Sequence, residues 1–138
     1  FDNVAFGLRL RRLDESEVSR RTRRILEIVH LSHLAQRLPS ELSGGQQQRV
    51  ACARALVSKP AVIFADEPTG NLDSKTTKEV MHMIRGFAKR FHQTIVLVSH
   101  DPEMTEYADR IVTLIDGRIV SNVENQVKAE IDAAPYIE

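Results

Sequence analysis

Two short apolar runs separated by a long amphipathic stretch constrain the fold of this chain more than any other feature. Residues 61–65 and 94–98 are almost continuously apolar, as is typical of strands that are buried on both faces of a parallel sheet. Between them, residues 74–91 place apolar side chains at helical spacing. A strand, a helix and a second strand in this order form a right-handed crossover between parallel strands. The sequence therefore predicts an α/β fold.

The segment before these strands has a different pattern, and we expect residues 1–42 to be mainly helical, without a strand. Asp14, followed by Glu17 three residues later, predicts a capping box at the start of a helix near 15–30. A shorter stretch follows and ends at Pro39. The chain therefore combines a helical segment with a later α/β segment.

Turn and cap signals divide the remainder of the chain. Residues 46–57 contain neither Gly nor Pro and are expected to form an amphipathic helix. The Asp-Pro pair at 101–102 predicts a helix start, with Asp as the cap and Pro at the first helical position. The Asp-Gly pair at 116–117 lies between two apolar runs and predicts a hairpin with a type I′ turn. Beyond Ser121 the periodicity is weak, and little structure is expected.

The composition is that of an ordinary globular domain. Of 138 residues, 42% are hydrophobic, and 19 basic side chains balance 19 acidic ones, so no global charge favours nucleic acid as a partner. The longest apolar runs have about five residues, far fewer than the roughly 18 that a membrane-spanning helix needs. Cys52 is the only cysteine, and we expect it to be buried as a small hydrophobe. Seven arginines near the start are expected on a solvated helix face: Arg9, Arg11, Arg12, Arg20, Arg21, Arg23 and Arg24.

The segment 42–50, LSGGQQQRV, places a hydroxyl and two glycines at the start of a predicted helix. Ser43, Gly44 and Gly45 would leave unpaired backbone N–H groups where an anion can bind. The alternative is an ordinary serine cap, with glycines that shape the turn. For a bare Ser-Gly-Gly the ordinary cap is the preferred interpretation.

Polar residues also follow each of the two predicted strands. Asp66 and Glu67 end the first strand, at the crevice where α/β sheets bind ligands, although both could simply cap the next element. Asp73 is expected to cap the following helix. His100 comes directly after the second strand, where a lone histidine is most often structural. The other histidines have no metal-ligand pattern: His30, His33, His82 and His92.

Taken at full length, these motifs resemble those of ABC-transporter ATPases. The string at 42–50 is similar to the family's signature motif, and the strand ending in Asp-Glu is similar to a Walker B motif followed by the catalytic glutamate. Residues 71–73 resemble the D-loop, and the Ser-His-Asp at 99–101 lies where the family has its switch histidine. The motifs occur in the family's order, and the resemblance covers roughly residues 3–122.

The resemblance implies that two of these segments contact nucleotide across a head-to-tail dimer. Ser43, Gly44, Gly45 and Gln46 would reach the γ-phosphate of ATP that is held by the P-loop of a second ATPase subunit. Asp73 belongs to the D-loop, which crosses the dimer interface, and is expected among the nucleotide-binding residues.

The resemblance also implies the catalytic and metal residues. Asp66 would hold Mg²⁺ through water. Glu67 would orient and polarise the attacking water, as a general base does. His100 would contact the γ-phosphate. Phosphoryl transfer depends mainly on positioning and charge stabilisation, so these few groups suffice.

One family motif is absent. No Gly-Lys dipeptide occurs in the chain, so it contains no P-loop of the form G-x-x-x-x-G-K-[ST]. We therefore expect a P-loop ATPase-type core with a parallel sheet that is truncated, lacking its first strands. Residues 1–42 would be part of the helical subdomain, 43–121 the second half of the ATPase core and 122–138 a C-terminal tail. The later motifs are most similar to the branch of lipoprotein-release and macrolide-export ATPases, whereas the opening FDNVAFGLRLR resembles importer ATPases.

For the intact protein, the resemblance implies ATP hydrolysis coupled to transport, on the cytoplasmic face of a membrane and bound to a membrane-spanning subunit that chooses the cargo. This chain alone is expected to be inactive. Two alternatives remain open. The chain could be a non-catalytic module that donates its signature motif to a separate P-loop partner, or part of a soluble ABC ATPase without a transport role.

The absent P-loop strand has a structural consequence. In the family that strand lies between the strands expected here at 94–98 and 111–115, so its absence leaves the apolar edge of 94–98 unpaired. We expect either the 111–120 hairpin to close onto strand 94–98 or a second chain to pair there. Strand 61–65 should still pair in parallel with 94–98.

Overall fold

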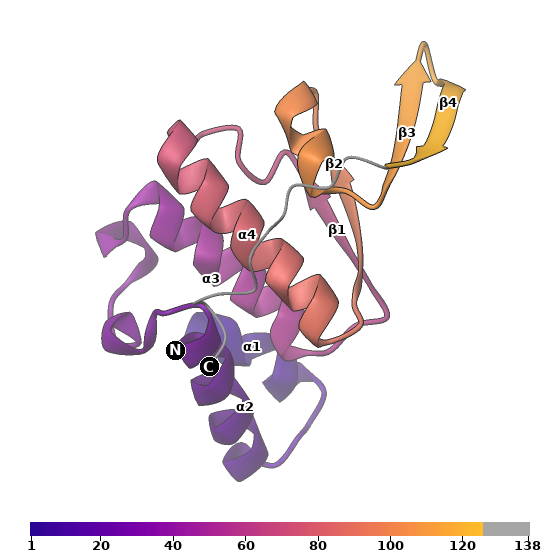
Figure 1. Cartoon of the computed structure of the whole chain (residues 1–138). Coiled ribbons are helices and arrows are strands. Elements are labelled where there is room, and N and C mark those ends of the chain that lie inside the picture. Colours follow the sequence, from indigo (N-terminus) through magenta and orange to yellow (C-terminus); the bar gives the residue numbers. More distant parts are fainter. Residues whose placement is uncertain (126–138) are drawn as a thin grey trace.

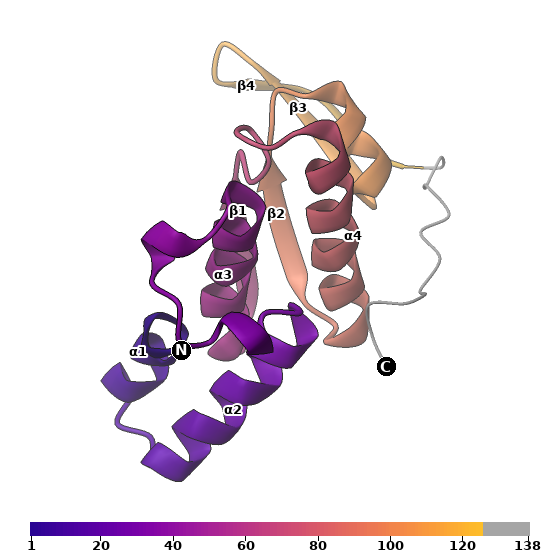
Figure 2. The same cartoon turned by 90° about the vertical axis from the view of Figure 1, so that its left-hand side faces the viewer.

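The computed structural model describes residues 1–125. Two helices lie at one end of the molecule, a pair of parallel strands with its covering helices in the middle, and a β-hairpin at the other end (Figures 1 and 2). The first elements are α1 (Asp2–Leu10), α2 (Glu15–Ile28) and the short 3₁₀ helices η1 (Ser32–Leu34) and η2 (Pro39–Glu41). The expectation of mainly helical structure in this part of the chain is confirmed.

Helix α2 begins where the sequence predicts, but its cap is only half of the expected capping box. The Asp14 carboxylate accepts a hydrogen bond from the Ser16 backbone N–H at 3.1 Å. Glu17 forms ion pairs with Arg20 and Arg21 instead of bonding back to the cap. Residues three and four apart are neighbours on a helix surface, so these arginines engage the Glu17 carboxylate.

Helix α3 (Gly44–Val57) packs against the first two helices and against α4 (Ser74–Arg90). The main apolar cluster joins all four helices, and its members include Leu8, Val18, Leu26, Val57 and Phe87. Cys52 is partly buried beside this cluster, and burial raises the pKa of its thiol to about 11. The expected role of Cys52 as a small hydrophobe is confirmed.

The two predicted strands form and pair in parallel. They are β1 (Val62–Asp66) and β2 (Thr94–Val98), with Asp66 opposite Val98 in the register. Helix α4 makes the crossover between them. The predicted strand–helix–strand unit is confirmed.

Within residues 1–125, only one face of the β1–β2 pair is covered. Ile63 packs against the α3 and α4 cluster, and Ile95 packs against α4. Alternate side chains point to the opposite face, where Phe64 is 77% exposed and Val98 is 53% exposed. The prediction that both strands are buried on both faces is therefore wrong, because helices lie against only one side of the pair.

The predicted hairpin also forms. After the 3₁₀ helix η3 (Pro102–Tyr107), β3 (Arg110–Ile115) pairs antiparallel with β4 (Arg118–Glu124). Asp116 and Gly117 at its turn have φ angles of +49° and +73°, and positive values at both positions are what a type I′ turn requires. β4 continues past Ser121, and most of the predicted tail, residues 126–138, lies outside the described residues.

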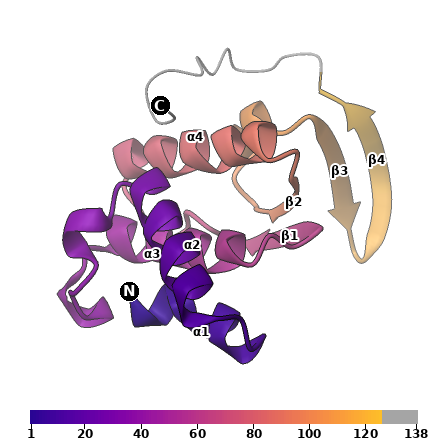
Figure 3. The same cartoon turned by 90° about the horizontal axis from the view of Figure 1, so that it is seen from below.

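This hairpin is a sheet of its own and stands apart from β1 and β2 (Figures 1 and 3). The expected closure of the hairpin onto β2 does not occur. The reason lies in η3, whose Met104 is buried among side chains of α4 and holds the connecting chain there. In residues 1–125, β2 pairs only with β1, and pairing by a second chain remains a prediction.

Candidate active site

The polar residues that follow β1 and β2 lie together, because parallel strands end at the same edge of a sheet. The Glu67 backbone N–H donates a hydrogen bond to the Val98 carbonyl oxygen at 2.9 Å, one residue beyond the regular pairing. Glu67 has a φ of +44°. Left-handed backbone is uncommon for a residue with a side chain, and such strain is often found at functional sites.

The Glu67 carboxylate binds the two residues after β2. Its Oε1 accepts a hydrogen bond from the His100 backbone N–H at 2.9 Å and lies 2.6 Å from His100 Nδ1. The Ser99 hydroxyl donates to Oε2 at 3.1 Å. The structure therefore brings together the two predicted catalytic residues, and adds Ser99 as a third member.

These contacts change the acidities of both partners. The bond to the His100 ring, with smaller effects of the His100 backbone N–H and Ser99, lowers the pKa of Glu67. Glu67 in turn raises the pKa of His100. The Glu67 carboxylate is ionised at neutral pH and can accept a hydrogen bond from water. The site is open to solvent, since the side chains are 36% exposed at Glu67 and 87% exposed at His100.

Asp66 is the last residue of β1 and is exposed. By strand alternation its side chain belongs to the bare face of the β1–β2 pair, together with Phe64. Among the residues that the structure describes, no group of three or more His, Cys, Asp or Glu side chains could hold a metal ion. Mg²⁺ in phosphate sites is usually held by one or two carboxylates together with waters and phosphate oxygens, so a single exposed Asp66 fits the predicted role.

A cavity of about 220 Å³ lies between α3 and β1, beside Asp66. Apart from Asp66, its polar lining consists of the Gln48 amide and the Cys52 thiol. The other lining side chains are apolar and include Ala51, Ala55, Leu56, Ile63 and Phe64. Phosphates bind to cationic side chains or converging N–H groups, so the cavity lining does not suit a nucleotide phosphate.

The signature-like segment forms a complete capping box. The Ser43 hydroxyl accepts from the Gln46 backbone N–H at 3.3 Å, and the Gln46 side-chain oxygen accepts from the Ser43 backbone N–H at 3.0 Å. The ordinary cap considered from the sequence is thus present. It holds Ser43 at the N-terminus of α3, where the next residue, Gly44, is exposed.

Asp73 caps the next helix, α4, through its own carboxylate. Its carboxylate accepts from the backbone N–H groups of Lys75 and Thr76, at 3.1 Å and 3.0 Å, and from the Thr76 hydroxyl at 2.6 Å. These bonds, led by the Thr76 hydroxyl, lower the pKa of Asp73. Thr76 also touches the first turn of α3, because a Cβ added to Gly45 would lie only 2.4 Å from its Cγ2. The starts of α3 and α4 are therefore in contact.

The predicted site residues thus fall into two groups, one at the strand ends and one at the helix starts. Among the hydrogen bonds and ion pairs of residues 1–125, none joins the 43–46 segment to Glu67 or His100. Sequence reasoning missed the contact of Thr76 and the 2.7 Å ion pair between Arg49 and Glu79. No sequence pattern specifies which side chains of two different helices will meet.

Family comparison agrees with the motifs and with the fold. The sequence profile of the ABC transporter family matches residues 2–70, which is half of the chain. The chain belongs to the ABC transporter family. Within the described residues, no helix is long and apolar enough to cross a membrane.

Relatives and solved structures extend the similarity to most of the chain. The chain is 41% identical over 138 residues to the sulfate/thiosulfate import ATP-binding protein CysA of Mesostigma viride. The alignment covers 99% of this chain and 40% of that protein. The structure is similar to cbiO1 from Clostridium perfringens, part of the ABC transporter complex cbiONQ, with a TM-score of 0.82, 32% identity and coverage of 88% of this chain and 49% of that one. It is also similar to the ATP-binding cassette MJ0796 in a dimeric post-hydrolysis state bound to ADP and Pi, with a TM-score of 0.68, 37% identity and coverage of 81% and 49%.

The comparisons correct the predicted branch of the family and show how much of its relatives the chain covers. The relative is an import ATP-binding protein. The predicted branch of lipoprotein release and macrolide export is not supported, and the importer-like opening was the better guide. The chain spans about 40% of the length of the curated relative and about half of the solved cassettes.

Proposed function

We propose that this chain is part of an ATP-hydrolysing subunit of an ABC transporter, in which Glu67 and His100 act on the γ-phosphate region of ATP. The observation that carries the proposal is the hydrogen-bonded group of Glu67, Ser99 and His100 at the carboxyl ends of two parallel strands. Ligands of α/β proteins bind at this edge. Glu67 is ionised there and open to solvent, as a residue that orients an attacking water must be.

Each residue then has a defined task. Glu67 accepts a hydrogen bond from the attacking water and turns its lone pair toward phosphorus. His100 is held against Glu67 through Nδ1 and, with its ring protonated, donates a hydrogen bond from Nε2 to a phosphate oxygen. Asp66 would hold Mg²⁺ through water, and the metal would supply charge neutralisation at the phosphates. The signature residues, Ser43 to Gln46, would act on ATP bound by a second subunit, and a similar cassette is dimeric with ADP and Pi.

The partners and setting follow from the same family membership. We propose that the intact protein binds a membrane-spanning subunit at the cytoplasmic face of a membrane and works as a dimer of ATPase subunits. We also propose import as the direction of transport, on the similarity to an import ATP-binding protein over 99% of this chain.

The test is Glu67→Gln in the full-length protein. The change keeps the size of the side chain and its bond to the His100 backbone N–H, but removes the charge that polarises water. We expect kcat to fall at least about 100-fold, the range for loss of a general base, with ATP binding retained. A matched control is Glu27→Gln, an exposed acid on α2 that belongs to neither group of site residues. Turnover that stays near the wild-type rate in Glu67→Gln would exclude the proposed role.

A further inference from the structure

The starts of α3 and α4 meet at the side chain of Thr76. One branch of Thr76 is its hydroxyl, which donates to the Asp73 carboxylate at 2.6 Å. The other branch is its methyl group, which faces Gly45 so closely that a Cβ there would lie 2.4 Å away. Real Cβ atoms do not approach other atoms to this distance. A side chain at Gly45 could therefore be placed only if Thr76 shifted.

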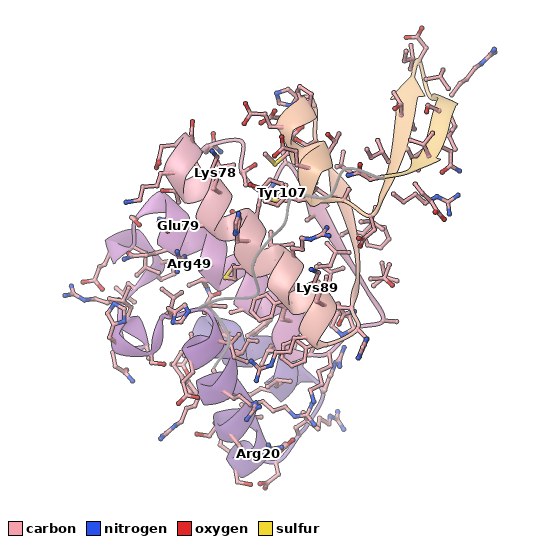
Figure 4. The ribbon with its side chains drawn as sticks, in the orientation of Figure 1. Arg20, Arg49, Lys78, Glu79, Lys89 and Tyr107 are labelled. Atoms are coloured by element: carbon pink, nitrogen blue, oxygen red, sulfur yellow. The ribbon has the colours of Figure 1, made fainter. Side chains whose placement is uncertain are left out.

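A second contact supports the first, one turn further along both helices. Arg49 on α3 and Glu79 on α4 form an ion pair of 2.7 Å, with their side chains 17% and 33% exposed (Figure 4). Partial burial and good geometry make this pair more effective than a fully exposed one. At Gly44, by contrast, an added Cβ would lie 3.6 Å from the Leu72 side chain, which is an ordinary contact distance, so Gly44 has the room that Gly45 lacks.

We propose that Thr76 is a positioning residue that joins the signature segment to the D-loop, so that both segments move as one rigid unit. The Thr76 hydroxyl holds the Asp73 carboxylate, and the Thr76 methyl group sets the distance between Gly45 and the first turn of α4. The proposal rests on the proposed function, in which the signature residues act on ATP bound by a second subunit, and on the expectation that residues 71–73 lie at the same interface. It adds that contacts within this chain fix the position of the signature segment relative to the D-loop, and that the contact with Thr76 requires a glycine at residue 45.

The consequence is specific to the catalytic step. If the two segments must close together on the partner's nucleotide, loosening either one lowers the fraction of closures that are productive. Interactions made only on closure appear in kcat, whereas the subunit's own binding of ATP appears mainly in KM. Loss of the Thr76 contacts should therefore reduce kcat and leave KM for ATP nearly unchanged.

Two substitutions at residue 76 separate the two contacts. Thr76→Val keeps both branches in shape but removes the hydroxyl that binds Asp73. Thr76→Ser keeps a hydroxyl for Asp73 and removes the methyl group that faces Gly45. In the full-length protein we expect Thr76→Val to lower kcat about tenfold, which corresponds to about 1.4 kcal/mol, and Thr76→Ser to have a smaller effect.

The decisive variant is Gly45→Ala, alone and combined with Thr76→Ser. Alone, the new Cβ overlaps the Thr76 methyl group, and we expect kcat to fall at least about tenfold. In the double variant the overlap is removed, and most of the activity should return. If Gly45→Ala is harmless, or if Thr76→Ser fails to restore it, the proposal is overturned, because the glycine is then not required by Thr76.

Hydrogen exchange of the same full-length variants gives a readout that does not need ATP hydrolysis. In the wild-type chain the backbone N–H groups of residues 75 and 76 bond to Asp73. Thr76→Val should speed hydrogen exchange of these two amides and of the first-turn amides of α3. Faster exchange confined to the α4 amides would refute the coupling. Wild-type protein that hydrolyses no ATP would reject the proposed function, while the exchange result would still decide whether the two segments are joined.

Discussion

The bare face of the β1–β2 pair should make the 138-residue chain self-associate. Phe64 is 77% exposed on this face, Val98 53%, and Val62 and Val96 40% each. The outer edge of β2 is also unpaired in the described structure, and an apolar unpaired edge recruits other chains. The chain has no net charge at pH 7, so no long-range repulsion keeps two copies apart.

The substitution Phe64→Ser measures the largest contribution to this association. A phenylalanine side chain buries at least about 150 Å², so a residue that is 77% exposed can lose more than about 100 Å² to a partner. At about 25 cal/mol per Å², this amounts to about 3 kcal/mol per copy if all of it is covered. Covering two thirds of it gives about 2 kcal/mol per copy. Both copies of a symmetric dimer carry the substitution, so the loss is about 4 kcal/mol and the dissociation constant should be roughly a thousandfold weaker.

Light scattering coupled to size-exclusion chromatography can measure this over a concentration range from about 1 µM to 1 mM, where exposed apolar surface drives association. Phe6→Ser is the matched control, since Phe6 is 58% exposed on α1, at the opposite end of the molecule from the hairpin (Figure 1). A wild-type chain that remains a monodisperse monomer over the whole range would refute the reasoning. Equal weakening by the two substitutions would show that the β1–β2 face is not the surface involved.

Three further outcomes are expected. Calorimetric titration of the 138-residue chain with Mg-ATP should give a dissociation constant no tighter than about 1 mM, or about −4 kcal/mol, because the chain has no P-loop; a micromolar constant would contradict this. His100→Gln should lower the melting temperature most between about pH 4.5 and 6.5. The raised pKa of folded His100 stabilises the protein below the pKa of an unfolded histidine, and the lowered pKa of folded Glu67 stabilises it above the pKa of an unfolded glutamate. Both contributions are fully present only between these two values. A pH-independent difference would disprove the charge pairing. Arg85→Met should lower the free energy of unfolding by about 1–3 kcal/mol in denaturant titrations, because the buried guanidinium binds the Tyr107 carbonyl and Asp109, whereas exposed Lys89→Met should have little effect.

Elements with strong local signals were predictable from the sequence. The crossover of β1, α4 and β2 and the Asp-Gly hairpin all form, because helical spacing, apolar runs and turn chemistry act over a few residues. The burial of the strands was predicted wrongly, because a continuous apolar run indicates that both faces can be covered, and not that they are. Coverage depends on which other elements the chain supplies, and in the described residues α3 and α4 both lie on the same side of the strands.

The two groups of site residues also differ in how far the sequence predicts their contacts. The proximity of Glu67 and His100 could be inferred, because each follows one of two parallel strands and the register places the strand ends side by side. The proximity of Gly45 and Thr76 could not, because two helix starts meet only through the packing of α3 on α4. Considered alone, the glycine pair favoured an ordinary helix cap, and only the family resemblance implied a phosphate contact. In the folded chain Gly45 also leaves free the space that Thr76 occupies. A motif glycine can therefore serve a ligand and an internal contact at once, and only the paired substitution at residues 45 and 76 separates the two.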